Sequence, residues 1–234
     1  MKKSKQQGED KFLKEAFTRG METYVTKLCE ERIPEQRDQE GDEVFKKRRT
    51  LELQKSFSAY TEKIGEGVNN FKKAKNKKAL LPILDKLKKC EALDPERVEE
   101  KTLQEVLSIS EEEFFLLYQV AGEAIDKENY SSASSMYTLL CLLNPTASLN
   151  WLGLGMAEVS QGNLEEGREV YHLALALDEE NPSINLYAAE CSFSLGEYNE
   201  ALSLTETALK NAEEDLELLD IAKSMKQEIL LKKA

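Results

Sequence analysis

The chain has 234 residues, of which 32% are charged and 7% aromatic, and its mean hydropathy is -0.53. Its longest apolar runs are five or six residues, whereas a membrane-spanning helix needs about 20, so we expect neither a membrane span nor a secretory signal. The net charge of -12 is uneven: residues 1–100 carry 24 basic and 20 acidic side chains, whereas residues 101–234 carry 8 and 24.

These features exclude several classes of function. An acidic C-terminal half is a poor surface for nucleic acid, because phosphates need cations, and we expect the basic runs at 46–49 and 71–78 to be solvated helix faces or to pair with acidic surfaces. One histidine, His172, and four cysteines without a CxxC spacing predict no metal site and no cofactor. With no Gly-rich phosphate loop or Ser/His/Asp arrangement, we expect no enzyme.

The first hundred residues are predicted to be a helical extension. Apolar residues recur every three to five positions from Phe12 to Leu28 and from Leu53 to Ile64, as on one face of a helix. Residues 34–42 look like a linker, the glycines Gly65 and Gly67 are expected to break the chain, and residues 92–96 to end a helix. This extension could be an antiparallel bundle or a dimerising arm.

A helix is predicted to begin after residue 110. Ser110 can cap its first turn, and Glu113 stands three positions later, as in a capping box. Leu103, Val106 and Leu107 predict a short helix before it.

From there the chain repeats with a period of 34 residues, without gaps, over Phe114–Ala147, Ser148–Asn181 and Pro182–Asp215. Small residues recur at position 8 of each repeat (Ala121, Gly155, Ala189) and at position 20 (Ala133, Gly167, Ala201). Position 15 reads Glu128, Gly162, Gly196, and position 24 reads Tyr137, Tyr171, Thr205.

This spacing resembles the tetratricopeptide pattern, in which each repeat is a hairpin of helices A and B. We expect the small residues where helix A meets helix B, the bulky residue at position 24 in the wedge toward the next repeat, and the turn at position 15. Asn or Asp with Pro ends helix B. The predicted fold is all-α: three tetratricopeptide repeats in an α-solenoid over residues 101–234, after the extension at residues 1–100.

The last repeat needs a cap with a polar outer face. We expect the capping helix at Asp215–Lys232, with Leu216, Leu219, Met225 and Ile229 as its buried stripe.

Helix A lines the concave side of such a stack, and its positions 2, 5, 9 and 12 point inward. These positions are almost all apolar, with one acid and no Lys or Arg; they are Phe115, Tyr118, Gly122 and Ile125, then Leu149, Leu152, Met156 and Val159, then Ser183, Leu186, Glu190 and Phe193. Without cations the groove cannot clamp an acidic C-terminus. We expect it to bind an extended apolar peptide, unless a neighbouring helix or a second subunit fills it.

Four motifs narrow the resemblance further: the FxxLY-like opening at Phe114–Tyr118, the LC at 140–141, WLGLG at 151–155 and AAEC at 188–191. Over about residues 103–234 the chain resembles the class II chaperones of bacterial type III secretion, which escort hydrophobic translocators. The resemblance implies a cytoplasmic homodimer that binds a short extended Pro/Leu segment in the groove, through Tyr118, Leu152, Met156, Val159 and Phe193, and does not itself insert into membranes.

The long extension departs from the family and could clamp a second part of the cargo. The predicted function is therefore a secretion chaperone that holds translocators before export, preventing aggregation and premature membrane insertion. A general tetratricopeptide scaffold in a bacterial cytoplasm is the alternative.

Overall fold

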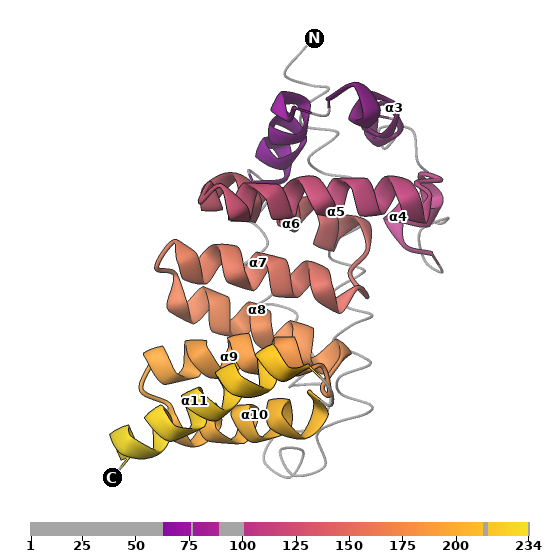
Figure 1. Ribbon diagram of the computed structural model, residues 1–234. Helices are drawn as coiled ribbons and strands as arrows, with labels where there is room; N and C mark the ends of the chain where they lie inside the picture. The colour runs from indigo at the N-terminus through magenta and orange to yellow at the C-terminus, as the bar shows by residue number, and fades with distance from the viewer. Residues whose placement is uncertain (1–62, 76, 89–100, 213–214, 234) are drawn as a thin grey trace, which may run out of the picture. The chain divides into compact units, whose positions relative to one another are not determined.

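A computed structural model describes residues 63–75, 77–88, 101–212 and 215–233 (Figure 1). All regular secondary structure in these residues is helical, as predicted. The helical patterns before residue 62, the linker at 34–42, the basic run at 46–49 and the helix end at 92–96 lie outside the described residues.

The chain divides into two compact units, Met1–Thr146 and Ala147–Ala234. The domain boundary predicted after residue 100 adjoins residues that the structure does not describe, and it stays a prediction.

The first unit contains a helical hairpin made of residues 63–73 and α3, Lys77–Lys88. Ile64 and Phe71 of the first helix and Leu80 and Ile83 of α3 are at most 1% exposed. Both helices therefore bury an apolar face while lysines of the basic run stay on the surface.

Gly65 and Gly67 do not break the chain, contrary to the expectation from the sequence, because both lie inside the helix of residues 63–73. A Cβ atom on Gly67 would lie 2.3 Å from the backbone oxygen of Ser135 on α6, Tyr130–Leu143, so only glycine permits this approach. Asn70 Nδ2 donates to Ser135 Oγ at 2.9 Å. The glycine thus serves close packing of the extension against the first repeat.

α5, Glu111–Asp126, begins at the predicted capping box. Ser110 Oγ accepts a hydrogen bond from Glu113 N, and the Glu113 carboxylate accepts one from Ser110 N at 2.8 Å. Lys86 of α3 also donates to this carboxylate, and its hydrogen bond holds the pKa of Glu113 below the usual value. The short helix α4, Leu103–Val106, precedes α5 as predicted and has its own capping box.

Each predicted repeat contains a pair of helices. The first pair is α5 and α6 in the first unit; the second unit contains α7 Ser148–Ser160 with α8 Leu164–Leu177, then α9 Pro182–Ser194 with α10 Tyr198–Asn211. In that unit α8 also packs against α9, so its two hairpins are stacked (Figure 1).

The turn between the two helices of each hairpin uses the residue at position 15. Gly162 and Gly196 have φ angles of 89° and 81°, in the left-handed region that favours glycine, and Glu128 takes the same conformation with φ 57°. The turn is therefore conserved in shape where the glycine is absent, at a cost of about 1 kcal/mol for Glu128.

Small residues lie where helices A and B meet, as predicted. A Cβ atom on Gly167 would lie 2.3 Å from Val159 Cγ2, and one on Gly155 would lie 2.4 Å from the ring of Tyr171. Tyr171 therefore packs on helix A of its own hairpin, and it also lies near Tyr187, Glu190 and Cys191 of α9, toward the next repeat as the sequence predicted. The ring needs the space that glycine leaves.

α11, Leu216–Lys233, covers α10 as the predicted cap. Ala222 and Ile229 form its fully buried face, with Leu218 and Met225 partly buried against the same unit. Leu216 is 75% exposed, so its placement in the buried stripe was wrong.

Candidate functional site

The helix A residues of the first repeat form an apolar strip on α5. Phe115 is 58% exposed, and Tyr118, Gly122 and Ile125 are partly exposed. Tyr118 packs edge-on against Tyr137 of α6, with ring centroids 5.6 Å apart. Burial raises the pKa of both phenols, so both stay neutral and the strip carries no charge at pH 7.

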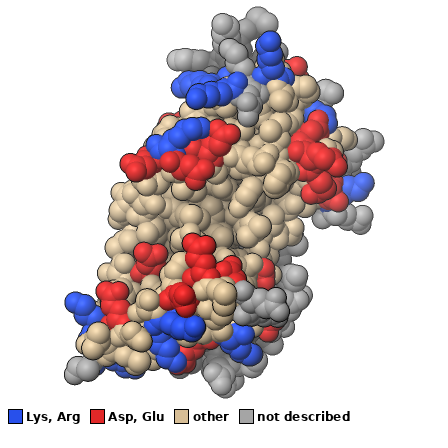
Figure 2. All heavy atoms as spheres, in the orientation of Figure 1, with Lys and Arg blue, Asp and Glu red and all other residues tan. Residues whose placement is uncertain are grey.

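The strip on α7 is also apolar. Leu149 is 46% exposed and Met156 and Val159 are partly exposed, while Leu152 is largely buried. Val159 also contacts Gly167 of α8, so one side of it supports the hairpin and only the rest is free. Figure 2 shows few charged side chains on the face drawn over α7. Met156, unbranched and flexible, is suited to pack against varied apolar side chains.

The strip on α9 differs from the prediction at Leu186. Leu186 is 8% exposed and packs with Ala208 of α10 and Ala222 of α11, so the cap covers a side chain that was predicted to face a ligand. Glu190 is exposed, and Phe193 is partly exposed with its ring 5.6 Å from that of Tyr198. Ser183 is partly exposed.

Sequence reasoning missed Tyr187, which is 37% exposed on α9 beside the buried Leu186. The other two repeats have Gln119 and Gly153 at this position, so no shared residue type marked it. The only available signal was an aromatic residue next to a predicted inward position.

The charged side chains of the second unit pair with one another along helices α8, α10 and α11. Arg168 binds Glu165 at 2.6 Å and also binds Glu197. His172 Nε2 lies 3.1 Å from Glu200, and Lys226 pairs with Glu206 at 2.7 Å. None of these groups belongs to the predicted inward positions, so the apolar strips are separate from the ion pairs.

The two described cysteines, Cys141 and Cys191, are buried and form no disulfide bond with each other. Cys141 is fully buried, and burial raises the pKa of its thiol. Cys191 donates to the backbone oxygen of Leu164 at 3.3 Å, and burial raises its pKa to about 11. Both thiols are therefore protonated at pH 7, whereas nucleophilic cysteines need a thiolate.

The described parts of the chain contain no group of three or more His, Cys, Asp or Glu residues placed to hold a metal ion. None of their helices is both long and apolar enough to cross a membrane.

Comparison with known proteins gives consistent results. A family model described as tetratricopeptide repeat matches residues 158–224. The low calcium response locus protein H of Yersinia pestis is 29% identical over 135 residues, which cover 56% of this chain and 80% of that protein.

Two solved structures are similar in fold and sequence. The type III secretion translocator chaperone SycD of Yersinia enterocolitica is 30% identical, with a TM-score of 0.50 over 53% of this chain and 88% of that one; another of its structures is described as an alternative dimer. PcrH of Pseudomonas aeruginosa, in complex with the chaperone binding region of PopD, is 26% identical, with a TM-score of 0.51 over 54% of this chain and 97% of that one. These proteins are matched over most of their length, but little more than half of this chain is matched.

Proposed function

Because this chain belongs to the class II chaperones of bacterial type III secretion, a family of tetratricopeptide-repeat proteins, we propose that it binds hydrophobic translocators before their export. The observation that carries the proposal is the likeness to PcrH, which was solved with the chaperone binding region of PopD. The alternative of a general scaffold has no comparable support.

The proposed contact surface is the set of apolar strips on the A helices. Phe115 and Leu149 expose large apolar side chains to water, and a bound apolar segment would bury them. In the first unit Tyr118 and Ile125 are partly exposed on α5, and in the second unit Met156 and Phe193 are partly exposed on α7 and α9; each would contact a partner that lies on its own strip. Leu186 is left out of this proposal because the cap already covers it.

The ligand is a short extended segment with Pro and Leu side chains. Each buried Leu-sized anchor contributes roughly 1.5–3 kcal/mol before ordering costs. Two or three anchors therefore contribute roughly 3–9 kcal/mol, which corresponds at best to about micromolar affinity. Such an affinity is tight enough to keep the segment out of water and weak enough for the cargo to leave.

The mechanism is binding, not catalysis. A translocator carries apolar stretches meant for a membrane, and free in the bacterial cytoplasm it would aggregate or insert early. Residues 101–234 carry 24 acidic and 8 basic side chains, so this part of the chain has a large net negative charge. Repulsion between like-charged complexes keeps them soluble. We place the protein in the cytoplasm as a homodimer, as the alternative dimer of SycD supports.

The test is co-expression with a candidate translocator, followed by affinity capture. Met156→Glu places a charge among the apolar anchors, and we expect at least a tenfold loss of captured cargo with unchanged helicity and melting temperature. Ser203→Glu adds the same charge at an exposed site on α10 and is expected to change nothing.

Two results would contradict the proposal at different levels. If the wild-type chain captures no translocator, the proposed function is wrong. If the wild-type chain and Met156→Glu capture equal amounts, the function stands and the contact surface lies elsewhere.

A further inference from the structure

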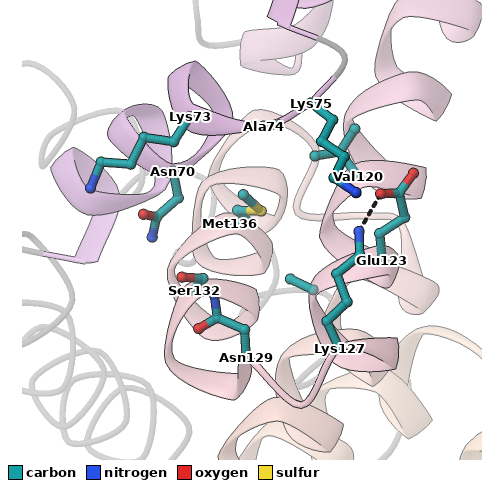
Figure 3. A pocket seen from close by; sticks show the side chains of 11 residues that line it. Asn70, Lys73, Ala74, Lys75, Val120, Glu123, Lys127, Asn129, Ser132 and Met136 are labelled. Atoms are coloured by element: carbon teal, nitrogen blue, oxygen red, sulfur yellow. Dashed lines mark hydrogen bonds and ion pairs between the residues drawn. The ribbon is translucent and has the colours of Figure 1, made fainter.

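A concave site lies in the first unit, between the helix of residues 63–73 and the α5–α6 hairpin. It is a pocket of about 460 Å³. Three segments line it: Asn70, Lys73, Ala74 and Lys75, then Val120, Glu123, Ala124 and Lys127, then Asn129, Ser132 and Met136 (Figure 3).

This pocket is separate from the apolar strip on the same helix. At 100° per residue, Val120, Ala124 and Lys127 lie on nearly the opposite side of α5 from Tyr118, Gly122 and Ile125. A ligand in the pocket therefore does not compete with a peptide on the strip. The pocket also uses the helix at residues 63–73, which precedes the part of the chain that resembles the chaperone family.

The floor of the pocket is apolar. Val120, Ala124 and Met136 are each less than a tenth exposed, so they are held in place by the core of the unit. Figure 3 places Met136 between two polar sides, with Lys75, Glu123 and Lys127 on one side and Asn70 and Lys73 on the other. An apolar side chain could rest on this floor with charged neighbours at both edges.

The rim has a surplus of positive charge. Of the lining residues, three are lysines and one is an acid, Glu123. Lys127 binds Glu123 at 2.6 Å, and this hydrogen bond lowers the pKa of the Glu123 carboxyl. Lys75 also lies near Glu123 and helps to lower the pKa of its carboxyl, but neither Lys75 nor Lys73 is within ion-pair distance of a carboxylate among the described residues.

The surrounding surface has the same sign. Lys72, Lys73, Lys75 and Lys78 are all exposed, and Figure 2 shows basic side chains gathered over this helical hairpin. At physiological ionic strength charges are screened beyond about 8 Å. The local lysines, and not the acidic total of the chain, therefore decide which ligands are attracted.

We propose that this pocket binds an acidic segment of a partner polypeptide, with carboxylates on Lys73 and Lys75 and an apolar side chain on Val120, Ala124 and Met136. Charge complementarity selects the carboxylates, and the dry floor selects a peptide over a bare anion. The site would add a second, salt-sensitive contact, independent of the apolar strips.

The test uses the full chain and three fluorescent ten-residue peptides of alternating residues: Glu/Leu, Gln/Leu and Lys/Leu. By fluorescence anisotropy, we expect saturable binding of the Glu/Leu peptide only, weakening as salt is raised. The double variant Lys73→Glu/Lys75→Glu should weaken this binding at least tenfold. Lys72→Glu, on the same helix but outside the pocket lining, should leave it within twofold.

Two additional readouts separate the sources of binding. Met156→Glu lies outside the pocket and should leave the affinity for the Glu/Leu peptide unchanged. The pocket proposal can therefore fail while the proposed translocator binding stands. Inorganic phosphate at matched ionic strength should not displace the peptide more than chloride does.

Three outcomes would overturn the proposal: no saturable binding to the wild-type chain, an equal loss with Lys72→Glu, or displacement by phosphate. The first would mean that the pocket has no affinity for an acidic peptide, the second that the attraction is non-specific, and the third that the site is a phosphate site.

Discussion

At the residue scale, single glycines decide how closely helices approach. Gly155 leaves room for the ring of Tyr171, and Gly167 leaves room for Val159. The 34-residue period predicted that small residues stand at these helix contacts, because the same positions recur in each repeat. The period also predicted that Tyr171 faces the next repeat, but it could not show that the ring rests on Gly155 of its own hairpin, because that contact depends on packing that spacing does not encode.

Gly155→Ala is expected to destabilise the second unit. The added Cβ would lie 2.4 Å from the Tyr171 ring, and overpacking of this kind costs about 1–3 kcal/mol, offset in part by the better helix propensity of alanine. Urea unfolding, followed through the fluorescence of the single tryptophan, Trp151, measures the change in free energy of unfolding.

The matched control is Gly122→Ala in helix A of the first repeat. Its nearest contact for a Cβ atom is the Tyr137 hydroxyl at 3.7 Å, an ordinary distance. Its unfolding free energy, followed by far-UV circular dichroism, should stay equal or rise by up to about 1 kcal/mol. Equal stability of the wild-type chain and Gly155→Ala would show that the ring can move aside.

At the element scale, helix pairs, caps and turns were predictable because each has a local cause. The capping box at Ser110 and Glu113 and the position 15 turns depend on neighbours in sequence. Gly67 was misread because glycine in a helix is usually unfavourable, and only its contact with α6 explains it.

The buried face of the cap also could not be predicted from local sequence alone. α11 was predicted in the right place, but its buried face is centred on Ala222 and Ile229. Ala222 is too small to stand out in an apolar pattern, and Leu216, six residues before it, lies on another side of the helix. The predicted stripe followed the large apolar residues, and it therefore included Leu216 and omitted Ala222.

Ile229→Ala is expected to loosen the cap and lower the free energy of unfolding by about 2–5 kcal/mol, because it removes a fully buried side chain. Leu231→Ala is the neighbouring control at an 80% exposed site and should change stability by less than about 0.5 kcal/mol. Urea unfolding of both variants tests the difference. Equal effects would mean that α11 does not cap the second unit through Ile229.

At the scale of the whole molecule, the sequence predicted the family better than the ligand surface. Recurring motifs identify an ancestry even where individual side chains are misplaced. Phe115, Leu149 and Met156 have the exposure that a contact surface needs, but Leu186 has become part of the cap contact. Spacing alone could not distinguish an inward position that stays open from one that a later helix covers.

The central claim is that the A helices hold the translocator, and site-specific photo-crosslinking in the complex tests it most directly. A benzophenone amino acid replaces Met156 on α7 in one sample and Ser203 on α10 in another, both co-expressed with the translocator. The account predicts cross-links from position 156 to one short apolar segment of the cargo, and none from position 203. Cross-links from position 203 alone, or equal yields from both positions, would contradict it.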